Sequence, residues 1–360
     1  MVCRRGRIGA HRPQRGRSPA GVRSQVSERR PPTLEDVAAR AGVSRATASR
    51  VVNDDPRVRA QARESVLAAI AHLGYLPNRA ARSLVVREPD SVAVLIHEPD
   101  QRIFADPFFS GMLRGVSQRL ADTPLQMVLL MGEPARDAGR MERYLRAGHT
   151  DGVIVVSAHR GDGLMAALSE TRLPTVFVGR PLDPDSHFPF VDVDNQEGGR
   201  LAAARLLSRG CRRIGTVTGP LDMAAGLDRF AGWAEVLTEA GMTLEAVEHG
   251  DFTPQGGAEA MHRLLAAHPD LDGVFVASDL MALAAMGELQ AAGRRVPDDV
   301  ALVGFDASAT ASMTRPPLTT VTNPVAQMAV RATDLLMQLL RGERATSEIF
   351  PTHLVEGGTA

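Results

Sequence analysis

The residues of this chain best suited to molecular recognition lie in the segment SRATASRVVN, positions 44–53. If the segment is helical, its apolar residues Ala48, Val51 and Val52 fall on one face. Arginine pairs with guanine through two hydrogen bonds in the major groove of DNA, and alanine can contact a thymine methyl group. The segment therefore predicts a helix that reads double-stranded DNA. The face available for this is formed by Arg45, Ala46, Thr47, Ser49 and Arg50.

The residues before this helix supply the element that would position it. Thr33 can cap a first helix, and Asp36 stands three residues later, as in a capping box. Gly42 can end that helix in the left-handed conformation, and Ser44 can cap the next one. Two short helices joined by a tight turn form the layout of a helix-turn-helix motif. The alternative is a small helical hairpin with no role in DNA binding.

A third helix is expected from Gln61 to Leu73. Arg59 and Ala60 precede it, so its N-terminus has no side-chain cap, which costs about 1 kcal/mol of local stability. A short basic helical pattern follows over residues 78–86, as in a hinge. We expect the core face of the third helix to carry Val66, Leu67, Ile70 and Leu73.

Charge is distributed unevenly along the chain. Residues 1–88 contain 18 arginines and 7 acidic residues, whereas residues 89–360 contain 23 basic and 35 acidic residues. A basic N-terminal part concentrates the affinity for phosphate at one end of the protein. Residues 1–32 are rich in Arg, Gly, Pro and Ser, so we expect a disordered extension, which is either a basic DNA-binding arm or an inert tail.

From position 91 the pattern changes to apolar strands that alternate with helical segments. This order predicts parallel sheets covered by helices, and the length favours two sheets rather than one. The fold class is therefore α/β, with a small all-α DNA-binding domain before it. The strand candidates are residues 92–96, 125–131, 152–156, 174–179, 213–219, 273–278 and 300–305.

Several polar and aromatic residues follow these strands. Open parallel sheets bind ligands beyond the carboxyl ends of their strands, and a mixture of acid, arginine, amide and aromatic groups suits the hydroxyls and ring faces of a neutral sugar or polyol. Some of these residues have simpler explanations, since Phe109 and Trp233 can be core residues and Asp279 can be a helix cap. The candidates for ligand binding are Asp106, Phe109, Arg180, Arg200, Arg229, Trp233, Asp279, Asp306 and Asn323.

The segments TLEDVAARAGVSRATASRVVN (33–53) and GYLPNRAARSL (74–84) resemble the LacI/GalR family of bacterial repressors. The resemblance continues through a region similar to periplasmic sugar-binding proteins and covers about residues 33–355. It implies a homodimer that binds a near-palindromic DNA operator and responds to a small molecule, expected here to be a sugar, that binds between two lobes.

The resemblance also implies a domain division. It places a helix-turn-helix domain at 33–76, a hinge helix and linker at 77–89, and an effector-binding and dimerisation domain at 90–355. Within this last domain, lobe 1 is expected at about 90–188 and 319–348, and lobe 2 at about 189–318. Three chain crossings would join the lobes.

Individual roles follow from the same resemblance. Leu84 is expected to wedge into the minor groove at the operator centre, and Asp279 to accept hydrogen bonds from two sugar hydroxyls. Arg200 corresponds to a sugar-binding arginine of relatives, whereas Ala307 stands where many relatives carry an aspartate. The residues expected to contact DNA are Thr33, Ser44, Arg45, Ala46, Thr47, Ser49, Arg50, Asn53, Tyr75, Asn78, Arg79, Arg82 and Leu84.

The sequence lacks the signatures of the common enzyme classes. It contains no GxSxG elbow, P-loop, HExxH motif or GxGxxG after a strand, and its ten histidines and two cysteines show no metal spacing. No secretory signal or membrane-spanning run is evident, so we expect a cytoplasmic protein without a cofactor. Two alternatives to a sugar-responsive regulator are a stand-alone solute-binding module and a regulator that binds a phosphoprotein.

Overall fold

The computed structural model describes residues 30, 32–53, 55–75, 90–133, 139–161 and 163–360. The chain divides into two compact units, Met1–Glu88 and Pro89–Ala360. We call them the head and the body and describe each by itself. The predicted hinge helix and linker, residues 77–89, lie outside the described residues, as does the expected extension except for Arg30 and Pro32.

The described part of the head contains three helices, α1 (Leu34–Ala41), α2 (Arg45–Val52) and α3 (Ala60–Leu73). Gly42 ends α1 in the left-handed conformation, with φ 68°, which glycine adopts without a steric penalty. The three helices enclose one small core that includes Val37, Ala48 and Val66. The expected helix-turn-helix layout is therefore present.

One prediction about the head core was wrong. Leu67 was expected to face the core, but this residue is 53% exposed, and Ala69 is buried instead. Val66 and Ala69 are three positions apart and share a face, whereas Leu67 lies about 100° around the helix from Val66. The absence of a side-chain cap on α3 was predicted correctly, because Arg59 makes no capping hydrogen bond.

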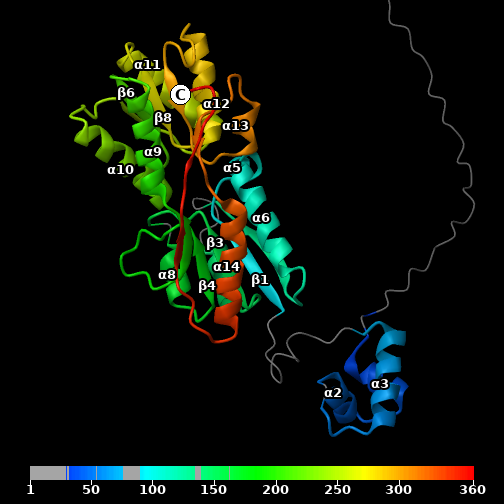
Figure 1. Cartoon of the computed structure of the whole chain (residues 1–360). Helices are drawn as coiled ribbons and strands as arrows, with labels where there is room; N and C mark the ends of the chain where they lie inside the picture. The colour runs from blue at the N-terminus through cyan, green and yellow to red at the C-terminus, as the bar shows by residue number, and fades with distance from the viewer. Residues whose placement is uncertain (1–29, 31, 54, 76–89, 134–138, 162) are drawn as a thin grey trace, which may run out of the picture. The chain divides into compact units, whose positions relative to one another are not determined.

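Lobe 1 of the body is built on a six-stranded parallel sheet with the order β11-β5-β4-β3-β1-β2. Helices from distant parts of the chain cover it, and α6 and α14 lie against one another (Figure 1). The strands are β1 (Ser91–Ile96), β2 (Gln126–Met131), β3 (Gly152–Val156), β4 (Thr175–Val178), β5 (Phe190–Val193) and β11 (Glu348–Phe350). The helices are α5 (Asp100–Ala105), α6 (Pro107–Leu120), α7 (Arg140–Arg146), α8 (Leu164–Ser169) and α14 (Val325–Leu340).

Lobe 2 contains a four-stranded parallel sheet with the order β7-β6-β8-β9 and a two-stranded antiparallel pair, β10-β12. Its strands are β6 (Ile214–Thr218), β7 (Val247–His249), β8 (Gly273–Val276), β9 (Ala301–Val303), β10 (Thr320–Val321) and β12 (Leu354–Val355). Its helices are α9 (Asn195–Ser208), α10 (Ala224–Glu239), α11 (Pro254–Ala267), α12 (Asp279–Ala291) and α13 (Ala309–Met313).

All seven predicted apolar strands are present, but the lobe boundaries differ from the expected ones. The segment 190–193 was assigned to lobe 2, yet it pairs with β4 and β11 in the sheet of lobe 1. The chain end also returns to lobe 2, where Thr359 O accepts a hydrogen bond from Leu302 N at 2.8 Å. Figure 1 shows the C-terminus among the elements of lobe 2. Both segments are short and mixed in polarity, so their pairing depends on long-range contacts rather than on a local pattern.

Three chain crossings join the lobes, as the family resemblance implied. The chain leaves the sheet of lobe 1 after β5, returns between β10 and α14, and crosses again between β11 and β12. Polar residues at these crossings, Asp194 and Asn323 among them, therefore lie where the two lobes meet. The crossings position the candidate ligand site.

Candidate functional site

The predicted DNA-reading face of the head is exposed. Ser44, Arg45, Ala46 and Arg50 are exposed, and Thr47, Ser49 and Asn53 are partly exposed. Ala48 and Val51, on the opposite face of α2, are buried in the head core. The burial pattern therefore leaves the side chains singled out for base reading available to a groove of DNA.

The predicted caps fix the geometry of this face. Thr33 Oγ1 accepts a hydrogen bond from Asp36 N at 3.4 Å, while Asp36 Oδ2 accepts one from Thr33 N at 2.8 Å. Ser44 Oγ accepts from Thr47 N at 3.1 Å. Because Thr33 and Ser44 each satisfy a helix N-terminus, their side chains orient α1 and α2 whether or not they contact DNA.

Two other predicted contact residues have structural partners. Arg45 Nε donates to Glu35 Oε1 at 2.5 Å on the surface of the head. Tyr75 is only 9% exposed and belongs to the head core. Its ring therefore stabilises the head, and little of it is available for other contacts. Asn78, Arg79, Arg82 and Leu84 lie outside the described residues.

The body has a cleft at the carboxyl ends of its strands, lined from both lobes. An outer cavity of about 910 Å³ is lined by residues that include Glu98, His159, Asp222 and Gln255. A smaller inner cavity of about 80 Å³ is lined by residues that include Phe108, Asn195, Arg229, Asp306 and Asn323. Arg102, Asp106 and Phe252 line both, so the two cavities adjoin.

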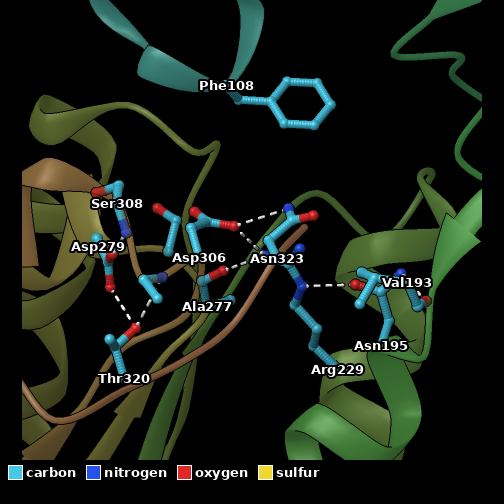
Figure 2. A network of polar contacts seen from close by, with 12 residues as sticks. Phe108, Val193, Asn195, Arg229, Ala277, Asp279, Asp306, Ser308, Thr320 and Asn323 are labelled. Atoms are coloured by element: carbon cyan, nitrogen blue, oxygen red, sulfur yellow. Dashed lines mark hydrogen bonds and ion pairs between the residues drawn. The ribbon is translucent and has the colours of Figure 1, made fainter. Parts of the chain in front are cut away.

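Arg229 is the centre of a polar network in the inner cavity (Figure 2). Its guanidinium is buried, donates from Nε to Asn195 Oδ1 at 2.8 Å and from Nη1 to the carbonyl of Ala277 at 2.7 Å, and lies 3.6 Å from Asp306 Oδ1. The ring of Phe305 stacks against it, with 3.5 Å between the guanidinium carbon and the ring centroid. These contacts hold the buried charge in one orientation.

Asp306 and Asn323 form the part of this network that faces the cavity. Asn323 Nδ2 donates to Asp306 Oδ1 at 3.2 Å, and both residues line the inner cavity. Asp306 has φ 112°, a strained backbone conformation of the kind found at functional sites. Burial raises the pKa of Asp306, and the nearby Arg229 opposes that rise. The Asn323 Oδ1 atom is buried and has no hydrogen-bond partner among the described residues, so it is available to a hydroxyl donor.

The aromatic residue that faces this network is Phe108, and the prediction of Phe109 was wrong. Phe108 lines the inner cavity, and Figure 2 shows its ring across the opening from Asp306 and Asn323. Phe109 is fully buried and packs edge-on against Phe108, with 5.3 Å between the ring centroids. Asp106 caps α6 by accepting from Phe108 N at 2.9 Å, which positions Phe108 at the cleft and turns Phe109 inward.

Asp279 does not occupy its expected place in the cleft. It is 1% exposed, and neither cavity described above is lined by it. Its carboxylate accepts hydrogen bonds from Thr320 Oγ1 at 2.6 Å and from Ser308 N at 2.7 Å, and Ser278 rather than Asp279 caps α12. Burial raises the pKa of Asp279. Asp279 therefore supports the 306–308 turn from behind, and its role toward a ligand stays a prediction.

Three further candidates are occupied by contacts within the protein. Arg200 pairs with Glu235 of α10 at 2.5 Å, because it lies five residues after the cleft-facing Asn195 and so points away from the cleft along α9. Trp233 is fully buried beside Phe230, with 5.8 Å between the ring centroids. Arg180 donates to Asp228 at 2.6 Å. Its neighbour Gly179 lines the inner cavity, but Arg180 does not.

Several residues of the cleft were not predicted from the sequence. Asn195, Phe108 and Phe252 line the inner cavity, and Glu98, His159 and Asp222 line the outer one. Glu98, His159, Asp222 and Phe252 follow strands, so the rule that located Asp306 could have found them as well. In the part of the chain that the structure describes, no group of three or more His, Cys, Asp or Glu side chains is placed to hold a metal ion. No helix described is both long and apolar enough to cross a membrane.

Comparison with known proteins covers both units. The model of the bacterial regulatory proteins of the lacI family matches residues 33–78, and the model of a periplasmic binding protein-like domain matches residues 203–360. The HTH-type transcriptional regulator CelR of Thermobifida fusca is 46% identical over 337 residues, which cover 92% of this chain and 98% of CelR. The ribose operon repressor of Bacillus subtilis (strain 168) is 31% identical over 312 residues, which cover 86% of this chain and 92% of that repressor.

Solved structures agree with these matches. A transcriptional regulator CelR–cellobiose complex has a TM-score of 0.73 at 43% identity and covers 91% of this chain and 100% of its own. A lac repressor dimer bound to operator and the anti-inducer ONPF has a TM-score of 0.77 at 28% identity, with coverage of 92% and 99%. A stand-alone solute-binding module does not fit, because the match includes the DNA-reading head. The chain belongs to the LacI family of bacterial regulatory proteins and is a sequence-specific DNA-binding regulator of transcription.

Proposed function

We propose that this protein is a dimeric cytoplasmic repressor that binds a near-palindromic operator and changes its operator affinity when a neutral sugar binds in the cleft. The sugar class that we propose is a disaccharide of the cellobiose type. The 46% identical relative CelR has a structure described as a complex with cellobiose, which supports this class.

The observation that carries the proposal is the inner network opposite Phe108. A sugar ring has hydroxyl groups at its edge and an apolar face formed by its C–H groups. Asp306, Asn323 and Arg229 offer acceptors and donors on one side of the inner cavity, and the ring of Phe108 offers an apolar surface on the other (Figure 2). The set thus matches both sides of a sugar ring.

The size of the cleft supports a ligand with more than one ring. The inner cavity of about 80 Å³ adjoins the outer cavity of about 910 Å³ through Arg102, Asp106 and Phe252. A disaccharide can place one ring against the inner network and the second in the outer cavity. A monosaccharide would leave the outer polar groups in contact with water, so we expect it to bind more weakly.

The proposed dimer has a physical reason beyond the relatives. Two large apolar side chains of the body are highly exposed, Phe104 of α5 at 78% and Met313 of α13 at 76%. Covering them against a second copy would remove this apolar surface from water. Sedimentation velocity of the full chain tests this: we expect a dimer for the wild type and a larger monomer fraction for Phe104→Asp.

Calorimetric titration with cellobiose and glucose tests the sugar proposal. We expect cellobiose to bind more tightly than glucose, and Asn323→Ala to weaken cellobiose binding at least about tenfold by removing the free Oδ1 acceptor. Gln196→Ala is the matched control, since this amide lies on the surface and bonds Glu235 instead of lining the cleft. Failure of the wild type to bind either sugar, together with binding of a phosphoprotein, would support the alternative regulator class.

A further inference from the structure

A histidine bridges the two lobes across the outer cavity, away from the inner network. His159 follows β3 in lobe 1, and Asp222 follows β6 in lobe 2. His159 Nδ1 lies 2.8 Å from Asp222 Oδ2, and His159 Nε2 lies 2.9 Å from Glu98 Oε1, which follows β1 in lobe 1. One imidazole thus joins a carboxylate of each lobe.

Contacts within lobe 1 hold the Glu98 end of this bridge in place. Glu98 is 3% exposed and also accepts hydrogen bonds from Arg102 Nη1 and Ser157 Oγ. The backbone adds a second connection between the lobes, because Arg160 N donates to the carbonyl of Asp222 at 2.8 Å. Lobe 1 therefore presents a positioned imidazole to a carboxylate of lobe 2.

The geometry defines the protonation state that the bridge requires. A neutral imidazole has one N–H, so it can donate to only one of two ionised carboxylates. Both ring nitrogens of His159 face a carboxylate oxygen, and both contacts are hydrogen bonds only when the ring is an imidazolium. The hydrogen bond with Glu98, opposed by burial, raises the pKa of His159 to about 8.

Eight charged groups surround this bridge. Glu98 and Asp222 accept hydrogen bonds from the imidazole, Arg102 pairs with Glu98, and Arg160 is the chain neighbour of His159. A second titratable ring and four more carboxylates line the same cavity, and they are His97, Asp106, Glu133, Asp251 and Glu259. Negative groups thus outnumber positive ones around the ring, which favours its charged form.

We propose that His159 is a positioning residue for the regulatory response: as an imidazolium it holds the two lobes together across the outer cavity, so that sugar binding takes up protons and weakens as the pH rises. The inference rests on the proposed sugar response, because a sugar that contacts both lobes binds best to the conformation in which the lobes are held together.

The direction and size of the effect follow from the contacts. The pKa of His159 is raised from 6.5 to about 8. The imidazolium therefore stabilises the bridge fully below about pH 6.5, and this contribution is lost as the pH rises through about 8. A shift of that size corresponds to about thirty-fold in an equilibrium constant. Because Glu98 stays beside His159 when the lobes separate, only the part due to Asp222 changes, and we expect a three- to tenfold weakening between pH 6.5 and pH 9.

The first experiment is calorimetric titration of the full chain with cellobiose from pH 6 to pH 9, in buffers of different ionisation enthalpy. For the wild type we expect net proton uptake on cellobiose binding near pH 8. This uptake should be lost in His159→Asn and in Asp222→Asn. The side chain of Asp222 is half exposed. His262→Asn is the matched control, because His262 pairs with Glu288 within lobe 2 at 3.3 Å. Equal pH dependence in wild type and His159→Asn would overturn the proposal.

A second measurement needs no sugar, so it separates this inference from the proposed function. Spin labels on Ser169→Cys in α8 and on Glu239→Cys in α10, in a Cys3→Ser background, report the distance between the lobes. We expect the wild-type distance distribution to shift or broaden between pH 6 and pH 9, His262→Asn to follow it, and His159→Asn to give the same distribution at both pH values. An unchanged wild-type distribution would overturn the bridge even if cellobiose binds, whereas the expected shift without cellobiose binding would refute only the proposed sugar.

Discussion

The head and the cleft present their recognition residues in opposite ways. The head presents exposed side chains from a single eight-residue helix, α2, and its contacts are local. The cleft presents a buried network whose members come from α9, α10 and the segments after β9 and β10. In the head, substitution of a contact residue changes an exposed surface, whereas in the cleft it also leaves a buried partner without a hydrogen bond.

The largest effect should come from the centre of the buried network. Arg229→Met removes the cation beside Asp306 and leaves Asn195 and the Ala277 carbonyl without their donor, which we expect to destabilise the body by about 3–5 kcal/mol. Thermal unfolding followed by calorimetry measures the loss. Arg200→Ala is the control, since its partly exposed pair with Glu235 contributes about 1 kcal/mol or less. Similar losses in both variants would remove the distinction between the two arginines.

The two neighbouring phenylalanines separate packing from recognition. Phe109→Ala should lower the free energy of unfolding by about 3–5 kcal/mol because the side chain is fully buried. Phe108→Ala should cost much less stability but weaken cellobiose binding about tenfold, since it removes the apolar wall of the inner cavity. Urea unfolding and calorimetric titration measure the two quantities. Normal sugar affinity in a folded Phe108→Ala variant would argue against the proposed sugar orientation.

A smaller, purely local effect is expected on the head. Arg50→Ala should weaken operator binding by about 1–3 kcal/mol and weaken binding to random DNA much less, because a base contact carries sequence information and a phosphate contact does not. Fluorescence anisotropy with both DNAs tests this. Arg40, exposed in the last turn of α1, provides the control as Arg40→Ala. An equal loss on both DNAs would mean that Arg50 contacts only phosphate.

The smallest effect concerns the uncapped helix of the head. Arg59→Ser should stabilise α3 by about 0.5–1 kcal/mol, because Arg59 occupies the cap position without a capping hydrogen bond. Thermal unfolding of the head measures this gain in stability, and Arg59→Ala should not show the gain. No gain with serine would show that tertiary packing, rather than the cap, sets the stability of this helix.

The difference between local and long-range contacts also decides what the sequence could predict. Periodicity and caps predicted the three helices of the head, and apolar runs predicted seven strands, because these signals are local. The strand rule led to Asp306, and Arg229 and Asn323 were also among the candidates; all three line the inner cavity. It did not separate Phe108 from Phe109, because the cap at Asp106 decides which ring turns inward.

The remaining candidates lie where long-range contacts set their surroundings. The type and place of Asp279 suggested a ligand acceptor, and Thr320, 41 residues away, and Ser308 both donate hydrogen bonds to its carboxylate. Arg200 and Trp233 were chosen by residue type, and α10 provides the partner or packing for each. The His159 bridge was missed because its two carboxylates, Glu98 and Asp222, lie 61 and 63 residues away in the sequence.

The most direct test of the account is the operator affinity of the full chain with and without saturating cellobiose, measured by fluorescence anisotropy on the same DNA. We predict that cellobiose changes the operator affinity at least about tenfold, within the usual range of coupling between two sites. The change should disappear in Asn323→Ala and persist in Gln196→Ala. Identical operator affinities in the presence and absence of cellobiose, when calorimetry shows that the sugar is bound, would contradict the claim that the cleft controls the head.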